Sequence, residues 1–219
     1  MTWADSIKAV LWIVSIAAIL FLSAGTLDWP SAWIFMAEFV IGALAMTLWL
    51  ARYDPGLLKE RMGGLFQKDQ VFWDKVFVVF IIVVWFSWLV LMALDAKRWG
   101  FSQMPAGLKA VGAVLIPIGF FIVWLTFREN SFAAPVIKIQ EERGRPYAIV
   151  RHPMYAGATL YMIGMPLLLG SWFGLLVLPL IFSALTLRIF IEETALRKGL
   201  PGYNDYATRI RYRLIPGVW

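Results

Sequence analysis

Long apolar stretches alternate with polar loops along most of this chain. Four of them are long and apolar enough to cross a bilayer, at residues 9–24, 30–50, 76–94 and 110–127. An α-helix rises about 1.5 Å per residue, so about 20 apolar residues cross a hydrocarbon core of about 30 Å. The polar loop at residues 52–75 contains the turn signals Pro55-Gly56 and Gly63-Gly64. The pattern therefore predicts four spanning helices, with a short interfacial helix in this loop.

A fifth apolar stretch is much longer than the others. Residues 154–187 contain no charge, and one helix of these 34 residues would be about 51 Å long. Since that length exceeds the hydrocarbon core, the stretch must fold back, with Pro166 and Gly170-Ser171 marking the bend. We predict a helical hairpin with two arms of about 16 residues. The predicted fold class is all-α: a polytopic membrane helical bundle of four spanning helices plus this C-terminal hairpin.

Composition supports a membrane protein and excludes several kinds of chemistry. Of the 219 residues, 61% are hydrophobic and 16% are charged, and 12 are tryptophan. The chain has no cysteine and one histidine, which excludes disulfides, cysteine-ligated metals and a thiol nucleophile, so we predict no metal site. The net charge of +6 fits basic loops beside anionic lipid, and we predict no binding to nucleic acid.

The distribution of basic residues predicts the orientation. Of the 20 lysines and arginines, all but Lys97, Arg98 and Lys109 fall on one side if the N-terminus is inside. Cytoplasmic loops carry this excess of positive charge, so we predict that both termini are inside. We expect one part, residues 1–127, to hold the first four helices, and a second part, residues 128–219, to be the catalytic half.

Three polar motifs in the second part are candidates for chemistry. The only histidine lies in Arg151-His152-Pro153-Met154-Tyr155-Ala156-Gly157, where a charged loop meets the hairpin. After the hairpin, Arg188 and Glu192 are four residues apart and share a helix face, and Glu193 follows. A short amphipathic helix with Tyr203 and Tyr206 on one face comes next, followed by a basic tail. Taken alone, the acids and basic residues also fit simple salt bridges and lipid contacts.

In this order and at these spacings, the motifs resemble the isoprenylcysteine carboxyl methyltransferase and phospholipid methyltransferase superfamily. The shared pattern is Arg-His-Pro-x-Tyr-x-Gly at residues 151–157, Arg-x-x-x-Glu-Glu-x-x-Leu at residues 188–196, and the tyrosines, arginine and proline of residues 203–216. The first four helices resemble the family only in being hydrophobic. The resemblance implies an integral membrane enzyme that takes S-adenosylmethionine from the cytosol and methylates an amphiphile held by the bilayer.

The resemblance also implies a set of cofactor-binding residues. These are His152, Pro153, Tyr155, Gly157, Tyr147, Glu192, Glu193, Tyr203, Tyr206 and Asn130. The two glutamates would accept hydrogen bonds from the ribose hydroxyls or the methionyl ammonium, and the tyrosines of the short helix would lie over the sulfonium or the adenine. Methyl transfer needs alignment and exclusion of water, and no metal.

For the methyl acceptor, the resemblance leaves the nucleophile open. The candidate catalytic residues are Arg188, Arg211, Arg213 and Glu192. The arginines are candidates to hold a carboxylate, which matches a guanidinium in a planar pair and needs no base at pH 7. An amine or thiol must lose a proton, which His152 or a glutamate would accept. We favour O-methylation of a carboxylate, with an amine or a thiol as alternatives.

Two other functions stay open. Glu38, an acid within the second apolar stretch, and the hairpin are also compatible with a transporter or channel, and a non-catalytic membrane scaffold can be built on the same fold. The expected partners of the enzyme are a lipophilic small molecule entering from the bilayer and the membrane lipids. The expected location is a bacterial or archaeal inner membrane, or the endoplasmic reticulum of a eukaryote, with the active site facing the cytoplasm.

Overall fold

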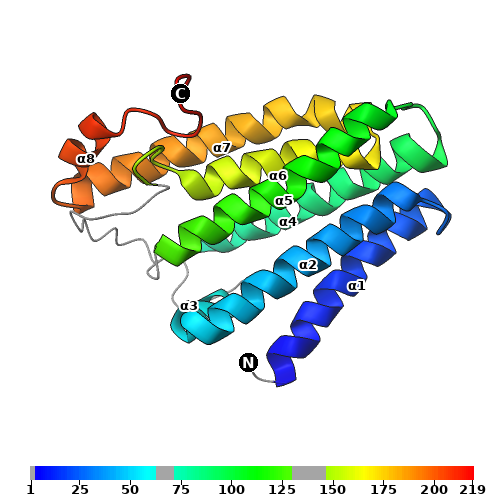
Figure 1. Cartoon of the computed structure of the whole chain (residues 1–219), viewed down its shortest axis with the longest axis horizontal. Coiled ribbons are helices and arrows are strands. Elements are labelled where there is room, and N and C mark those ends of the chain that lie inside the picture. Colours follow the sequence, from blue (N-terminus) through cyan, green and yellow to red (C-terminus); the bar gives the residue numbers. More distant parts are fainter. Residues whose placement is uncertain (1–2, 63–71, 130–146) are drawn as a thin grey trace. The chain divides into compact units, whose positions relative to one another are not determined.

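The computed structural model describes residues 3–62, 72–129 and 147–219 (Figure 1). Within them there is no strand, which confirms the predicted all-α class. In chain order the elements are α1 (Trp3–Ala24), α2 (Pro30–Tyr53), α3 (Pro55–Met62), α4 (Phe72–Ala93), the π-helical turn η1 (Leu94–Arg98), α5 (Ala106–Glu129), α6 (Pro153–Leu169), α7 (Trp172–Gly199) and α8 (Tyr203–Arg209).

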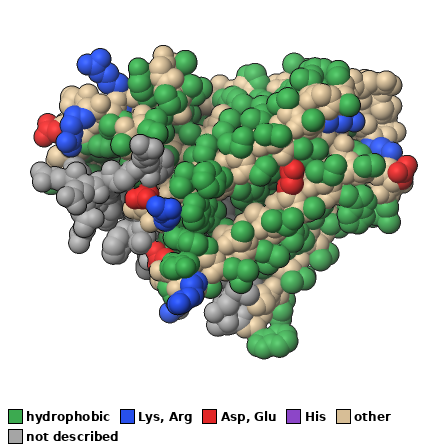
Figure 2. All heavy atoms as spheres, viewed as in Figure 1, with side chains coloured by type: hydrophobic (Ala, Val, Ile, Leu, Met, Phe, Trp, Pro, Cys, Tyr) green, Lys and Arg blue, Asp and Glu red, His purple; other side chains and the backbone are tan. Residues whose placement is uncertain are grey.

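The predicted spanning stretches correspond to α1, α2, α4 and α5. With α7, five helices are long and apolar enough to cross a membrane. Their outward side chains are apolar too: Leu22 is 76% exposed, Leu48 is 68% exposed and Leu180 is 70% exposed. Hydrophobic side chains are spread widely over the face shown in Figure 2. Such a surface is stable against lipid tails and unfavourable in water.

The predicted short helix in the first polar loop is confirmed as α3. Asp54 separates it from α2, and the Asp54 Oδ1 atom accepts a hydrogen bond from the Leu57 backbone N–H at 3.0 Å. Pro55 occupies the first helical position, where its missing N–H is not needed. The rest of this loop, residues 63–71, lies outside the described residues, as does the short extended piece expected at residues 136–140.

The predicted hairpin is present, but its arms are unequal. The bend falls at Gly170-Ser171, as predicted, and Gly170 has a φ of 88°, a left-handed conformation that favours glycine. Pro166 does not mark the bend, because it lies inside α6, and its carbonyl accepts the N–H groups of both bend residues at 2.9 Å. The apolar second arm continues without a break into the helix predicted for Arg188 and Glu192, so that α7 has 28 residues and ends at Gly199.

The chain divides into two compact units. The first is Met1–Ala113 with Met165–Val177, and the second is Val114–Gly164 with Leu178–Trp219. In the first unit, α1 packs against α2, α4 and η1. Its core includes Ile16 and Leu20 of α1 and Leu89 of α4, which are fully buried. The second unit holds the three motifs.

A buried carboxylate in the first unit caps the N-terminus of α7, together with two serines. Asp95, in η1, is 0% exposed, and its Oδ2 atom accepts hydrogen bonds from the hydroxyls of Ser102 at 2.5 Å and Ser171 at 2.6 Å. The same oxygen accepts the N–H of Phe173 at 3.3 Å, and the two serine oxygens accept the N–H groups of Trp172 and Gly174. The first three N–H groups of α7, which have no partner within the helix, are thereby satisfied.

In the second unit, α5 and α6 meet through two glycines. A Cβ atom on Gly157 would lie 2.7 Å from the carbonyl oxygen of Gly119, and one on Gly119 would lie 2.6 Å from the carbonyl oxygen of Gly157. Both positions therefore require glycine for the two backbones to touch, as is common between membrane helices. This contact fixes α6, which carries the histidine motif at its first turn.

Candidate active site

The histidine motif begins α6 and is held by the C-terminal tail. Pro153 is the first residue of α6, and the carbonyl of His152 accepts the first helical hydrogen bond, from Ala156, at 3.0 Å. The backbone N–H groups of Arg151 and His152 donate to the carbonyls of Tyr212 and Arg213, both at 2.9 Å. Two segments that are about 60 residues apart in the sequence are thus paired through their backbones.

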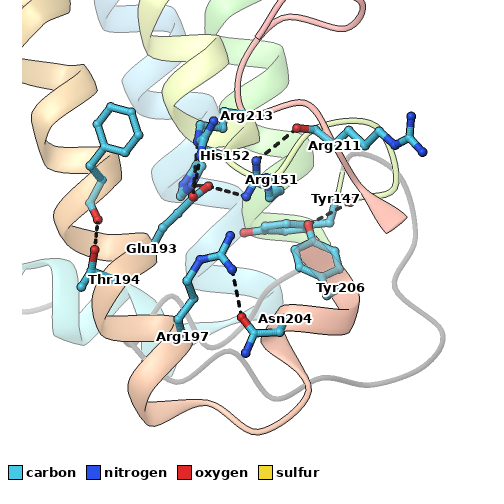
Figure 3. Close-up of polar contacts among 11 residues, drawn as sticks. Tyr147, Arg151, His152, Glu193, Thr194, Arg197, Asn204, Tyr206, Arg211 and Arg213 are labelled. Carbon is cyan, nitrogen blue, oxygen red and sulfur yellow. Dashed lines mark hydrogen bonds and ion pairs between the residues drawn. The ribbon is translucent and has the colours of Figure 1, made fainter. Parts of the chain in front are cut away.

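Glu193, near the end of α7, is at the centre of a buried ionic cluster (Figure 3). It is 3% exposed. Its Oε1 atom lies 2.9 Å from Arg151 Nη1 and 3.3 Å from His152 Nε2. Its Oε2 atom accepts hydrogen bonds from Arg213 Nε at 3.2 Å and Nη2 at 3.1 Å. One carboxylate therefore joins the motif before α6, the helix α7 and the tail.

Aromatic rings hold the Arg213 guanidinium in place. Its central carbon lies 5.1 Å from the ring centre of Phe190 and 5.4 Å from that of Trp219. The faces of aromatic rings attract a cation such as this guanidinium. Because Phe190 lies three residues before Glu193 on α7, one helix face supplies both the acid and an aromatic contact for Arg213.

Glu192, the neighbour of Glu193 in the sequence, makes a contact of its own. The hydroxyl of Tyr155 donates a hydrogen bond to Glu192 Oε2 at 2.8 Å, and the Arg188 side chain lies within reach of the same hydroxyl. The rings of Tyr155 and His152 are stacked with centres 5.7 Å apart. The first turn of α6 and the last turns of α7 thus present an imidazole, a phenol and two carboxylates together.

The tyrosines of α8 border the same cluster. Tyr203 is 1% exposed, and its ring centre lies 5.9 Å from that of Tyr206. The Tyr206 hydroxyl donates to the backbone carbonyl of Tyr147 at 3.0 Å. Burial raises the pKa of Tyr203 above its ordinary value, and the negative charge of Glu193 raises it further, while the charge of Arg151 opposes the rise. The Tyr203 hydroxyl therefore keeps its proton at neutral pH.

Comparison with protein families gives one result that bears on this arrangement. Residues 108–201 match the family model described as phospholipid methyltransferase. We call these residues the methyltransferase segment, after the description of the family model. The match covers less than half of the chain and supports the resemblance to the membrane methyltransferase superfamily that the motifs suggested. Neither the comparison with curated proteins nor that with solved structures gives a match.

The methyltransferase segment covers part of the site only. It contains α6 and α7, and with them His152, Tyr155, Glu192 and Glu193. The tail and α8 follow it. The contacts of Arg213 with Glu193 show that residues beyond the match complete the cluster.

Several predicted site residues are not gathered as the sequence suggested. The three arginines predicted to hold a carboxylate have different surroundings. Arg213 is engaged by Glu193, Arg211 is exposed and points away from Glu193 in Figure 3, and Arg188 is exposed beside Tyr155. The lack of a side chain at Gly157 serves the contact with α5. Asn130 lies outside the described residues. The roles assigned to these residues stay predictions.

Sequence reasoning missed three residues that build the cluster. Arg151 was noted only as part of the motif, yet it is 8% exposed and contacts Glu193. Phe190 and Trp219 enclose Arg213. The spacing of Phe190 from Glu193 was a usable signal, whereas nothing in the sequence tied Trp219 to them.

Proposed function

We propose that this protein is an S-adenosylmethionine-dependent methyltransferase that methylates an amphiphile held in the membrane. The observation that carries the proposal is the convergence of His152 and Tyr155 with Glu192 and Glu193 inside the methyltransferase segment. Residues that the resemblance assigned to one cofactor are within contact distance of one another, although they are about 40 positions apart in the sequence.

The side chains of the site have the chemical groups needed to bind the parts of S-adenosylmethionine. The cofactor carries a cationic sulfonium, an ammonium, a carboxylate, ribose hydroxyls and an adenine ring. Glu192 offers a carboxylate to the ammonium or the ribose, and Tyr155 and Tyr206 offer ring faces to the sulfonium or the adenine. In the described part of the chain, no group of acids and histidine is placed to hold a metal ion.

The residues around Glu192 are suited to alignment and charge balance. S-adenosylmethionine, when bound, supplies a methyl group on a positively charged sulfur. The Tyr155 hydroxyl orients the Glu192 carboxylate, and the Glu193 cluster fixes the helix that carries it. Holding reactants in line and excluding water are the main contributions a protein makes to this displacement.

For the acceptor, we propose a membrane lipid, with a phospholipid headgroup to be tested first. The description of the matched family names a phospholipid. The carboxylate acceptor favoured by the sequence relied on three arginines, of which Arg213 is already engaged by Glu193 and Arg188 lies beside Tyr155. An amine acceptor must lose a proton, and Glu192, close to the Tyr155 hydroxyl, is the carboxylate we propose to receive it.

We further propose that the active site faces the cytoplasm, because 17 of the 20 lysines and arginines share that side when both termini are inside. The division into a helical part, residues 1–127, and a catalytic half, residues 128–219, stays a prediction.

The proposal is tested by radiolabelled methyl transfer with the purified protein in lipid-detergent micelles. Aminophospholipids, prenyl-thiol carboxylates, fatty acids and small thiols are offered with labelled S-adenosylmethionine. We expect label in a lipid product, a loss of at least about tenfold in rate for Glu192→Gln, and no loss for Arg98→Ala. Absence of label in every acceptor, together with absence of cofactor binding, would refute the proposal.

A further inference from the structure

Arg151 has more hydrogen-bond donors than the cluster can satisfy. Its side chain is 6% exposed, with Nη1 at 2.9 Å from Glu193 Oε1 and Nη2 donating to the carbonyl of Arg211 at 3.1 Å. Its Nε atom is buried and has no hydrogen-bond partner in the described part of the chain. Buried donors are almost always satisfied in folded proteins, by protein, water or a ligand.

The Tyr203 hydroxyl also lacks a hydrogen-bond partner among the described residues. It is buried and makes no hydrogen bond of good geometry to any described residue, although the charges of Arg151 and Glu193 both act on it. A close approach between Tyr203 and Arg151 would not solve the problem. Arg151 can only donate, so the hydroxyl proton would still lack an acceptor. The two residues together therefore lack an acceptor.

The charges of the cluster also favour an anion beside Arg151 and Tyr203. Two guanidinium groups, Arg151 and Arg213, share the single carboxylate of Glu193. These two guanidinium groups exceed the charge of the Glu193 carboxylate by one positive charge. A buried positive charge without a counterion strongly destabilises a protein. An anion bound beside that charge offsets the cost.

We propose that Arg151 and Tyr203 form an anion-binding subsite that takes a carboxylate or phosphate oxygen of a ligand. The inference rests on the proposed function, because that function supplies two such oxygens: the carboxylate of the cofactor's amino acid and the phosphate of a lipid headgroup. Since the Tyr203 hydroxyl keeps its proton, it donates to the bound oxygen together with Arg151.

Stability without ligand gives the first test, because the chain offers a matched pair of tyrosines. Tyr203→Phe removes a hydroxyl without a partner, so we expect the unfolding temperature of the ligand-free protein to stay the same or rise. Tyr206→Phe removes a hydroxyl bonded to the Tyr147 carbonyl, and should lower the unfolding temperature by about 2–4 °C. An equal drop in both variants would overturn the proposal.

Calorimetry then tests the cofactor as the source of the anion. S-adenosylhomocysteine and its decarboxylated analogue are titrated into the wild type, Tyr203→Phe and the control Tyr212→Phe, whose residue is 39% exposed. If the subsite binds the cofactor carboxylate, the wild type and the control prefer S-adenosylhomocysteine by about tenfold or more, and Tyr203→Phe loses that preference.

A lipid series tests the other source. Thermal stabilisation by phosphatidylethanolamine in mixed micelles is compared with that by diacylglycerol, which lacks the phosphate. If the subsite binds the lipid phosphate, the wild type prefers the phospholipid, Tyr203→Phe loses the preference, and the two cofactor analogues bind alike.

The outcomes separate the subsite from the proposed function. Loss of either preference in Tyr203→Phe supports the subsite and identifies its ligand. A wild type that lacks both preferences, or a Tyr203→Phe that keeps them, overturns it while cofactor binding still stands. A wild type that binds neither cofactor analogue refutes the proposed function, and the lipid series alone then decides the subsite.

Discussion

Two buried carboxylates organise the two units of this protein, and they have different neighbours. Among the described residues, the donors to Asp95 are neutral, namely two serine hydroxyls and a backbone N–H group. Glu193 is contacted by two arginines and a histidine. The Asp95 cluster has an acceptor to spare, since its Oδ1 atom has no partner among the described residues, whereas the Glu193 cluster has donors to spare.

From this difference we propose a structural role for Asp95 and a functional role for Glu193. The hydrogen bonds around Asp95 satisfy the first turn of α7 and set the hairpin bend. The contacts around Glu193 join three chain segments, two within and one beyond the residues that match the family model, and leave a surplus of positive charge. We therefore expect changes at Asp95 to affect folding alone, and changes at Glu193 to affect folding and ligand binding.

The largest effect is expected for Glu193→Ala. It leaves the buried Arg151 without its counterion and should lower the free energy of unfolding by about 3–5 kcal/mol. The adjacent Glu192→Ala removes one hydrogen bond, with Tyr155, and should lower it by about 1 kcal/mol. Chemical unfolding in detergent micelles measures both, and equal losses would contradict the central position of Glu193.

The next largest effect is expected for Asp95→Ala. It should lower the free energy of unfolding by about 2–3 kcal/mol, because three donors lose their acceptor. The protein that remains folded should bind S-adenosylhomocysteine with unchanged affinity. The control is Asp28→Ala, whose carboxylate is exposed and lies 3.8 Å from Lys97, and which should not change stability measurably. A loss of cofactor affinity in Asp95→Ala would remove the distinction between the two clusters.

A smaller effect is expected for Gly157→Ala. The added methyl group would lie 2.7 Å from the Gly119 carbonyl oxygen, so α5 and α6 must move apart. We expect this to lower the free energy of unfolding by about 1–3 kcal/mol. Gly107→Ala, at a position with open space around it, is the matched control and should be neutral or slightly stabilising. Thermal unfolding of the two variants side by side checks this, and equal stability would show that the glycine contact is dispensable.

The smallest effect is expected for Arg211→Ala. Arg151 contacts the backbone carbonyl of Arg211, and the Arg211 side chain is exposed, so its removal should leave the unfolding temperature unchanged. A drop as large as that of Gly157→Ala would mean that this side chain supports the tail.

Much of the fold was predictable because lipid imposes simple rules. Helix length and the absence of charge located α1, α2, α4 and α5, and the excess length of residues 154–187 located the hairpin. Pro166 was misread because a proline near the end of an apolar run is compatible with a bend and with a helix interior. Arg188 ends the uncharged stretch but not the helix, because a charged residue is accommodated where α7 continues to Gly199.

The site was predictable in part. Motif order identified His152, Tyr155, Glu192 and Glu193, and the structure brings all four together. The partner that each acid takes depends on tertiary contacts, which a spacing pattern does not contain. The sequence therefore gave no reason to place Arg213 on Glu193, or to notice Asp95, whose serine partners lie 7 and 76 residues away.

The central claim is that the Tyr155–Glu192 contact and the adjoining Glu193 cluster form one S-adenosylmethionine site. Calorimetric titration of S-adenosylhomocysteine into the wild type and Glu192→Gln tests it most directly. The account predicts one site per chain in the wild type and at least about tenfold weaker binding in the variant, with unchanged unfolding behaviour. Equal affinity in the two proteins, or no binding to the wild type, would contradict it.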